Sequence, residues 1–193
     1  MKHILITLLV FVTLSGSARQ VIPAKLIKRG SPDTLNVTIQ VRTSLLYPDI
    51  IDELSFKGTL FIFINEEKQK VKEEDVDCLV FVDLKGKRRE FVSDRFINFL
   101  DMGGILLEKM YVGKISWYRD YTYQINAHNP YQHADYFINS RSVSPGVNPK
   151  RELKFRTTDM PELLPKIKKI KTDEDILAIL KQYNEGTAGT DKK

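Results

Sequence analysis

The sequence predicts an α+β fold: a mainly antiparallel β-sheet, arranged as a sandwich or a partly open barrel, with a short helical segment at the C-terminus. Three observations lead to this prediction. Strand-like runs follow one another between residues 34 and 157, and a hairpin signal separates two of them. Helical periodicity with capping residues begins only after residue 158. Strands and helices do not alternate regularly, so a doubly wound nucleotide-binding fold is not expected.

The first strands are read from alternation. In "LNVTIQVRT" (residues 35–43) apolar and polar residues alternate strictly, which is typical of a half-buried strand. The run "TLFIFI" (residues 59–64) is apolar on both faces and is expected to be a central strand. The next thirteen residues, "NEEKQKVKEEDVD", are almost all polar or charged. We expect an exposed connection there, with a short helical turn near Glu73.

The run "CLVFVDLKGKRREFVS" (residues 78–93) predicts a hairpin. Two β-rich stretches flank Lys85-Gly86, where glycine can take the positive φ of a tight turn. A second reversal is expected at Gly103-Gly104, so residues 105–112 and 114–124 are predicted to be further strands. Gly113 between them indicates a bulge or bend.

The stretch "YVGKISWYRDYTY" (residues 111–123) holds four tyrosines and the single tryptophan of the chain. At a period of two, Trp117 shares one face with Ile115, Arg119, Tyr121 and Tyr123. This pattern favours a strand whose aromatic side chains fill the core. The other interpretation is a ligand platform, in which Tyr118 and Arg119 face outward and Tyr131 is a third contact.

A polar loop is predicted for "NAHNPYQHAD" (residues 126–135), followed by a strand at residues 135–140, a loop at 143–152 and a strand, "LKFRT", at 153–157. Helices are then expected at about residues 160–170 and 173–185. Thr172 and Asp175 form a capping-box pair, and Gly186 is expected to close the second helix. Residues 187–193 are expected to be disordered.

The N-terminus has the pattern of a signal peptide. Lys2 precedes an apolar run of eleven residues (4–14), and small residues follow, so we expect cleavage after Ala18. Residues 19–33 are expected to be an extended segment, and residues 34–186 a single domain. Cysteine does not directly follow the apolar run, so a lipoprotein is not expected. Cys78 is the only cysteine; it cannot form an intramolecular disulfide, and we expect a buried thiol.

The net charge of +5 is a modest excess for a chain in which 28% of the residues are charged. Nucleic-acid binding needs a concentrated cationic face, and the densest basic cluster, "KIKKIK" (residues 166–171), is interrupted by isoleucine. We therefore expect no nucleic-acid partner. No later segment is apolar enough to cross a membrane after cleavage.

Signals for catalysis are weak. His128, His133 and Asp135 could surround a metal ion, but their spacing matches no helical pair and the sequence around them favours a solvated loop. No G-x-S-x-G elbow and no phosphate-binding loop occurs, and Asp120, beside Trp117, is the only carboxylate that stands out. We nominate no catalytic residue and expect no cofactor.

Three stretches taken together resemble a family of uncharacterised exported bacterial proteins, a domain of unknown function. They are "YVGKISWYRDY", "VKEEDVDCLVFVDLKGKRREFVS" and "FRTTDMPELLPKIKKIKTDEDILAILKQYNE", within residues 55–186. The chain departs from this pattern by a shorter spacing between "EFVS" and "YVGK" and by its "NAHNPYQHAD" loop. The shared motifs are structural and carry no catalytic residue over; the resemblance implies an envelope or secreted protein.

The sequence therefore predicts an exported bacterial protein, periplasmic or secreted, with a non-catalytic binding or structural role. Its partner would be another envelope protein or polymer, bound through a sheet face or edge strand. Tyr118, Arg119 and Tyr131 are the expected contacts. The alternative is a small envelope hydrolase, metal-assisted, that uses the loop containing His128, His133 and Asp135.

Overall fold

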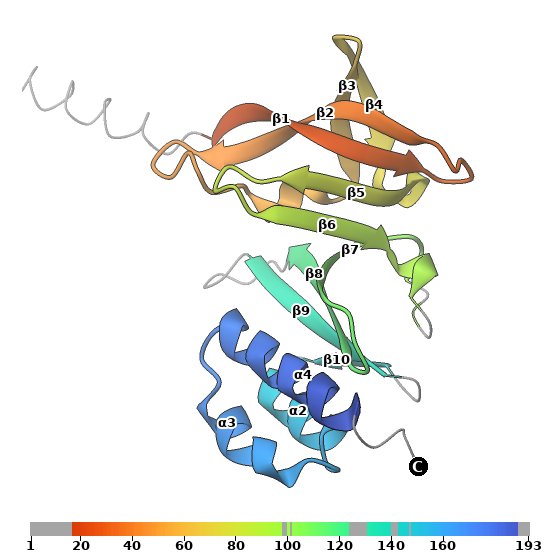
Figure 1. Cartoon of the computed structure of the whole chain (residues 1–193). Helices are drawn as coiled ribbons and strands as arrows, with labels where there is room; N and C mark the ends of the chain where they lie inside the picture. The colour runs from red at the N-terminus through yellow and green to blue at the C-terminus, as the bar shows by residue number, and fades with distance from the viewer. Residues whose placement is uncertain are drawn as a thin grey trace, which may run out of the picture. The chain divides into compact units, whose positions relative to one another are not determined.

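The computed structural model describes residues 17–97, 100, 102–123, 131–139, 143–146 and 148–188 (Figure 1). The chain divides into two compact units. One consists of Met1–Ile97 and Asp101–Leu106, and the other of Asn98–Leu100 and Leu107–Lys193. Two compact units need not be two domains, so the single domain expected for residues 34–186 stays a prediction. Each unit is described by itself.

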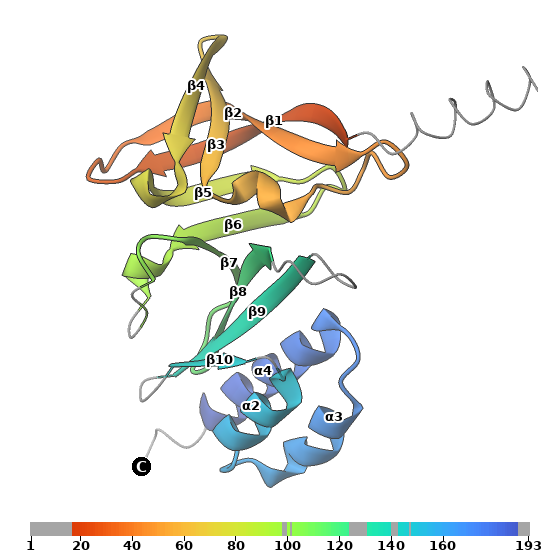
Figure 2. The same cartoon turned by 180° about the vertical axis from the view of Figure 1, so that it is seen from behind.

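The first unit is an antiparallel sheet. Its strands are β1 (Ser17–Lys28), β2 (Thr34–Ser44), β3 (Thr59–Ile64), β4 (Glu67–Lys72), β5 (Val76–Val82) and β6 (Arg88–Ser93). Their spatial order is β6-β5-β1-β2-β3-β4 (Figures 1 and 2). Three short 3-10 turns connect them: η1 (Glu53–Phe56), η2 (Glu73–Asp75) and η3 (Asp94–Phe96). The mainly antiparallel sheet is confirmed, and residues 19–28 of the expected extended segment belong to β1.

The strand β1 is central to this unit because it pairs with β2 on one side and β5 on the other. Eleven register pairs join β1 to β2, from Ser17↔Ser44 to Ile27↔Thr34. Val37, Ile39 and Val41 of β2 are buried while the polar residues between them are not, which confirms the alternation read from "LNVTIQVRT". The strand β3 spans the predicted residues 59–64 and lies next to the edge strand β4.

Three phenylalanines form the aromatic centre of the first unit. The ring centroids of Phe56 and Phe81 are 5.0 Å apart, and those of Phe56 and Phe91 are 4.8 Å apart. The guanidinium of Arg89 lies 5.2 Å from the centroid of the Phe91 ring and donates to both carboxylate oxygens of Glu53, at 2.9 and 2.8 Å. This pairing matters because a buried guanidinium without an anion would destabilise the core.

The charged run at residues 65–77 is not the exposed connection that the sequence predicts. Residues 67–72 form β4, which pairs with β3 from Thr59↔Lys72 to Ile64↔Glu67. The hairpin turn is made by Asn65 and Glu66, both with positive φ (50° and 70°), a geometry that matches the twist of paired strands. The helical turn expected near Glu73 is confirmed as η2.

Glu73 is buried and ties together three segments of the first unit. Its carboxylate accepts hydrogen bonds from the backbone N–H of Gly58 and of Leu106, both at 2.7 Å, and from the Lys57 ammonium at 3.1 Å. The same ammonium donates to the carbonyl of Leu106 at 3.0 Å. These hydrogen bonds satisfy both oxygens of the buried Glu73 carboxylate.

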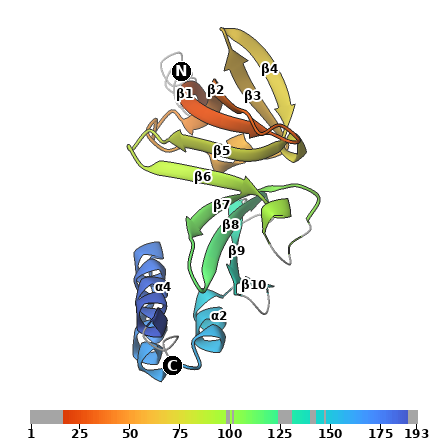
Figure 3. The same cartoon turned by 45° about the vertical axis from the view of Figure 1, so that its right-hand side comes forward.

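The second unit combines four strands with the helical segment. The strands are β7 (Leu106–Tyr111), whose first residue is the last of the first unit, β8 (Ser116–Tyr123), β9 (Tyr131–Ile138) and β10 (Val143–Gly146). Their order is β10-β9-β8-β7, all antiparallel. The helices are α2 (Pro149–Arg156), α3 (Leu164–Lys169) and α4 (Asp173–Ala188), with the 3-10 turn η4 (Pro161–Leu163) before α3 (Figure 3). The C-terminal helical segment is confirmed.

Four local predictions for the second unit are wrong. The loop expected at residues 143–152 contains β10 and the first residues of α2. Residues 153–157, expected as a strand, lie in and just after α2, which starts because Asn148 caps the backbone N–H of Arg151 and Pro149 occupies the first turn. Residues 131–135, expected as a loop, belong to β9. The helix α4 does not stop at Gly186 but runs on to Ala188, although its Thr172–Asp175 capping box is confirmed.

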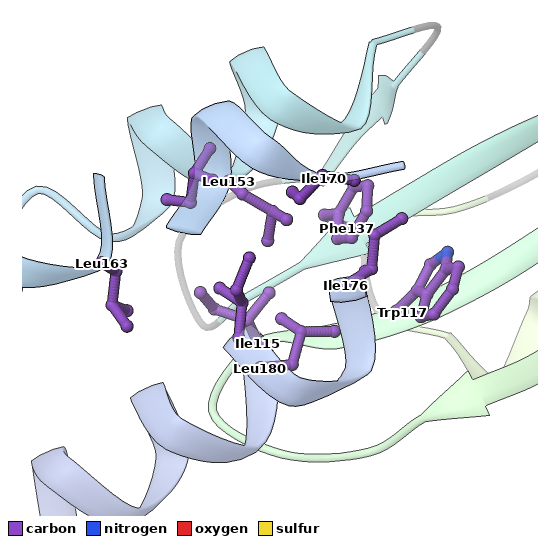
Figure 4. Packing of buried hydrophobic residues seen from close by; sticks show 10 residues of the cluster. Ile115, Trp117, Phe137, Leu153, Leu163, Ile170, Ile176 and Leu180 are labelled. Atoms are coloured by element: carbon purple, nitrogen blue, oxygen red, sulfur yellow. The ribbon is translucent and has the colours of Figure 1, made fainter. Parts of the chain in front are cut away.

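The helices pack on β8 and β9 around an apolar cluster (Figure 4). Trp117 and Phe137 come from the strands, and their rings are stacked with centroids 6.0 Å apart. The other members are Ile115, Leu153, Leu163, Ile167, Ile170, Ile176, Ile179 and Leu180. Trp117 is 1% exposed, which confirms that the tryptophan of the aromatic stretch fills the core. No helix among the described residues is long and apolar enough to cross a membrane.

The β5–β6 turn tests the hairpin prediction directly, because Gly86 has φ +80°. We expect Gly86→Ala to lower the free energy of unfolding by about 1–2 kcal/mol, since alanine is strained in this region. Gly86→Asn should lose less, because asparagine tolerates a positive φ. Urea denaturation checks both variants, and equal losses would contradict the backbone explanation.

Candidate functional site

The predicted contacts occupy different environments. Tyr118 is half-buried in β8, and Tyr131 is the first residue of β9, opposite Tyr123. Arg119 is only 7% exposed, so the expectation that it faces outward is wrong. Arg119 therefore does not contribute to an exposed aromatic and cationic surface.

Arg119 instead lies at the centre of a buried ion-pair network. Its guanidinium donates to both carboxylate oxygens of Asp135 (2.8 and 3.3 Å) in β9 and to both of Asp173 (2.6 and 2.8 Å) at the start of α4. The indole N–H of Trp117 donates to Asp135 at 2.9 Å. The network ties the sheet to the first turn of α4, so its evident role is structural.

Two opposing effects set the pKa of Arg119. Burial alone would lower the pKa of Arg119, but the hydrogen bonds to Asp173 and Asp135 outweigh it and raise the pKa above its ordinary value. A cation held between two carboxylates stays charged at every accessible pH. We infer that Asp135 serves as the anion of an internal ion pair.

The candidate metal loop is only partly described. His133 is half-exposed, and its Nε2 lies 3.7 Å from the nearer carboxylate oxygen of Asp135. His128 lies outside the described residues. Within the part of the chain that the structure describes, no group of three His, Cys, Asp or Glu side chains could hold a metal ion.

A different surface of the first unit combines rings, cations and an amide. We call it the open face, because it is the side of the sheet opposite the buried residues of β1–β3. Cross-strand neighbours place their side chains on one face, and the register sets Val21, Gln40, Phe61 and Lys70 in one row across four strands. The next row includes Phe63 and Lys68. The open face thus consists of Val21, Gln40, Phe61, Phe63, Lys68 and Lys70.

Lys68 joins the strands of the open face. Its ammonium lies 4.5 Å from the centroid of the Phe61 ring and 5.9 Å from that of Phe63, and it donates to the side-chain oxygen of Gln40 at 2.9 Å. The ammonium of Lys70 lies 5.9 Å from the Phe61 centroid. Cations held over aromatic faces are pre-positioned for an anion that approaches from solvent.

Two shallow depressions lie on the same unit. One, of about 450 Å³, is lined by Val21, Asn36, Val37, Thr38, Phe63, Asn65 and Glu66. The other, of about 490 Å³, is lined mainly by apolar residues that include Ile27, Val92 and Phe96, and by Cys78. Cys78 is half-buried rather than fully buried, because it borders this second depression.

Sequence reasoning missed the open face because it interpreted residues 65–77 as a connection. A signal was present: Lys68, Lys70 and Lys72 recur at a period of two, directly after the apolar run 59–64. Such spacing indicates a strand with a cationic face, paired with the strand before it. The interspersed glutamates and the absence of a glycine at the turn hid the hairpin.

Comparison of the chain with protein-family models, with curated proteins and with solved structures found no match. The resemblance to a family of exported bacterial proteins therefore stays a hypothesis. The function has to be proposed from the residues of the two units themselves.

The Arg119 network makes a stability prediction. We expect Arg119→Met to lower the free energy of unfolding by about 3–5 kcal/mol, because it leaves the buried Asp135 without a cation. Asp173 is more exposed, so Asp173→Asn should cost only about 1 kcal/mol. Chemical denaturation measures both. As a control, Arg151→Met removes an exposed arginine from α2 and should change stability by less than about 0.5 kcal/mol.

His133 makes a prediction about pH. Burial, and then the charge of Arg119, lowers its pKa in the folded chain. In the unfolded chain the pKa of this histidine is about 6.5, so the unfolded chain binds the proton more readily than the folded chain does. The free energy of unfolding therefore falls as the pH falls through that value.

We expect the melting temperature of His133→Gln to fall less than that of the wild type when the pH is lowered from about 7.5 to about 5.5. Lys154→Gln, which makes the same exchange for glutamine at an exposed lysine of α2, should keep the wild-type dependence. Thermal unfolding across the range measures all three proteins. A steeper dependence in His133→Gln would contradict the assigned direction of the pKa change.

Proposed function

We propose that this chain is an exported bacterial protein, periplasmic or secreted, with a non-catalytic binding role, and that its open face binds an anionic polymer of the cell envelope. The observation that carries the proposal is the arrangement of Lys68 and Lys70 over the Phe61 ring. It places two ammonium groups beside an aromatic surface, on strands β3 and β4 at one edge of the first unit's sheet (Figures 1 and 2).

The chemistry of the open face selects the class of ligand. An ammonium bound to a ring keeps its charge and its hydrogen-bond donors available to a carboxylate or a phosphate. Gln40 adds an amide, and Val21, which is 56% exposed, adds apolar contact area. The rows run across four strands, so they suit an extended chain with repeated negative charges. The net charge of +5 favours the approach of such a polymer.

The alternative function, a metal-assisted envelope hydrolase, receives less support. It requires Asp135 as a metal ligand or an acid–base group, but Trp117 and Arg119 already occupy the carboxylate oxygens of Asp135. The remaining proposed ligand in the described residues is His133, whose side chain is half-exposed. We therefore do not extend the proposal to catalysis.

Export is proposed from the N-terminal pattern. Cleavage after Ala18 would remove two residues of β1 and keep the nine register pairs from Arg19↔Arg42 to Ile27↔Thr34. The loss of two terminal pairs is compatible with a stable first unit. The resemblance to exported bacterial proteins supports the same localisation, and the lack of a cysteine directly after the apolar run argues against a lipoprotein.

We also infer that the sheet of the first unit is a partly open barrel rather than half of a sandwich. The strand β2 pairs with β1 at eleven positions but with β3 at only three, which is consistent with a sheet that bends sharply at β2. Such bending lets one sheet enclose its own core and keep its other side in solvent.

Binding to two polyanions tests the function. Poly(glycerol phosphate) carries phosphates and alginate carries carboxylates, so the pair tells which anion is preferred. We expect the full chain to bind at least one of them, and Lys68→Glu/Lys70→Glu to weaken binding at least about tenfold, because two attractions become repulsions. Calorimetric titration at low ionic strength is the measurement.

The control is Lys154→Glu/Lys181→Glu, which changes the net charge equally at exposed positions of α2 and α4. It should bind nearly as well as the wild type if the open face is the site. Equal weakening in both double variants would mean that only net charge matters. Failure of the wild-type chain to bind either polymer would refute the proposal.

A further inference from the structure

The loop that follows β2 carries an unusual concentration of exposed apolar side chains. Leu45, Leu46, Tyr47 and Ile50 are 48%, 64%, 60% and 46% exposed. Four large apolar residues within six positions form a patch rather than the scattered single residues that are normal on a protein surface. We call residues 45–50 the apolar loop.

The backbone of the apolar loop is held in place. The Ser44 hydroxyl accepts from the backbone N–H of Leu46 at 3.2 Å, and the Tyr47 carbonyl accepts from the N–H of Ile50 at 3.0 Å. The Gln20 side chain in β1 donates to the Pro48 carbonyl at 2.8 Å. Hydrogen bonds already order the backbone of this loop while its apolar side chains are exposed. Insertion into an apolar phase therefore costs little further ordering.

The start of β1 lies at the same end of the first unit. Ser17 is opposite Ser44, the residue directly before the apolar loop, and residues 1–16 precede Ser17 in the sequence. Figures 1 and 2 show the loop at the end where β1 begins and β2 ends. Those sixteen residues contain the apolar run 4–14. The start of β1 and the apolar loop therefore lie at the same end of the unit.

A basic turn borders the apolar loop. The Lys85 ammonium lies 3.6 Å from the Asp49 carboxylate, which places the β5–β6 turn next to the loop. Lys87 and Arg88 follow on the same turn and are exposed. The carboxylate of Asp83 accepts from the backbone N–H groups of Lys85 and Lys87, at 2.9 and 2.8 Å, so it is already engaged within the turn.

We propose that the apolar loop is a membrane-contact site, which inserts its leucines and Tyr47 into the surface of an anionic lipid bilayer while the basic turn meets the headgroups. Leucine side chains next to a tyrosine and flanked by cations match the interfacial region of a bilayer. A second copy of the chain fits less well, because a stable interface uses about 20–30 residues a side and the loop has six. The open face plays no part in this proposal.

Vesicle binding by the chain from Arg19 onward, which is the exported form proposed above, tests the site. The vesicles contain equal parts of phosphatidylglycerol and phosphatidylethanolamine, and a second set contains phosphatidylcholine alone. We expect Leu45→Ser/Leu46→Ser to lower the partition coefficient on the anionic vesicles at least about tenfold, because two apolar side chains no longer transfer from water. Every protein in the series starts at Arg19, as the proposed cleavage leaves it, so residues 4–14 do not contribute and the difference between variants reports on the loop.

The matched control is Val112→Ser/Phe155→Ser, which removes two apolar side chains that are 59% and 69% exposed in the second unit. It should partition like the wild type. Equal partitioning of the loop variant and the wild type would overturn the proposal, and so would equal losses in the two double variants or no binding by the wild type. Circular dichroism of each variant confirms that it is folded.

A second measurement locates the contact. Tyr47→Trp introduces an indole at the loop, and lipids brominated on their acyl chains should quench its emission. In Val112→Trp the introduced indole should not be quenched. Quenching in both variants, or in neither, would overturn the proposal. Light scattering adds a further outcome: a dimer that only the loop variant loses, with vesicle binding unchanged, would assign the loop to a second copy instead.

Discussion

The second unit depends on one arginine held between two carboxylates. Arg119 comes from a strand, Asp135 from the neighbouring strand and Asp173 from the first turn of α4, so a single guanidinium fixes the register of two strands and the position of a helix. The apolar cluster of Trp117, Phe137 and the helical isoleucines supplies most of the burial. Hydrophobic contact is non-directional, whereas a forked guanidinium accepts few geometries, so the ion pairs select one packing of α4 from several that would bury similar area.

The first unit also contains a buried arginine that is paired with a carboxylate. Arg89 lies against three phenylalanine rings and is neutralised by Glu53 from η1. In both units a buried cation contacts aromatic rings and a carboxylate that comes from a separate segment. Such a pair is favourable only when the cation and the carboxylate are both in position. It therefore selects one tertiary arrangement more than it adds to the free energy of unfolding. The charges available to ligands are consequently the exposed ones, Lys68 and Lys70 above all.

Local pattern predicted most of the strands and the last helix. The alternation of apolar and polar residues predicted β2, the Lys85-Gly86 turn predicted the β5–β6 hairpin, and the Thr172–Asp175 capping box predicted the start of α4. The errors share a physical cause. The strand β4 holds three lysines among six residues, and lysine has low strand propensity, so its pairing with β3 is what makes it a strand. Arg119 looked like a surface residue because its two partners lie 16 and 54 positions away, a separation that no local pattern reports.

The position of β1 has a consequence for the order of folding. Its partner β5 pairs through Ala24↔Phe81, so the oldest part of the emerging polypeptide cannot complete its hydrogen bonds until more than fifty further residues have been delivered. A chain delivered N-terminus first would keep β1 paired with β2 alone until β5, which ends at Val82, has emerged. Until β5 pairs with it, β1 presents an unpaired strand edge to which a holding chaperone could bind.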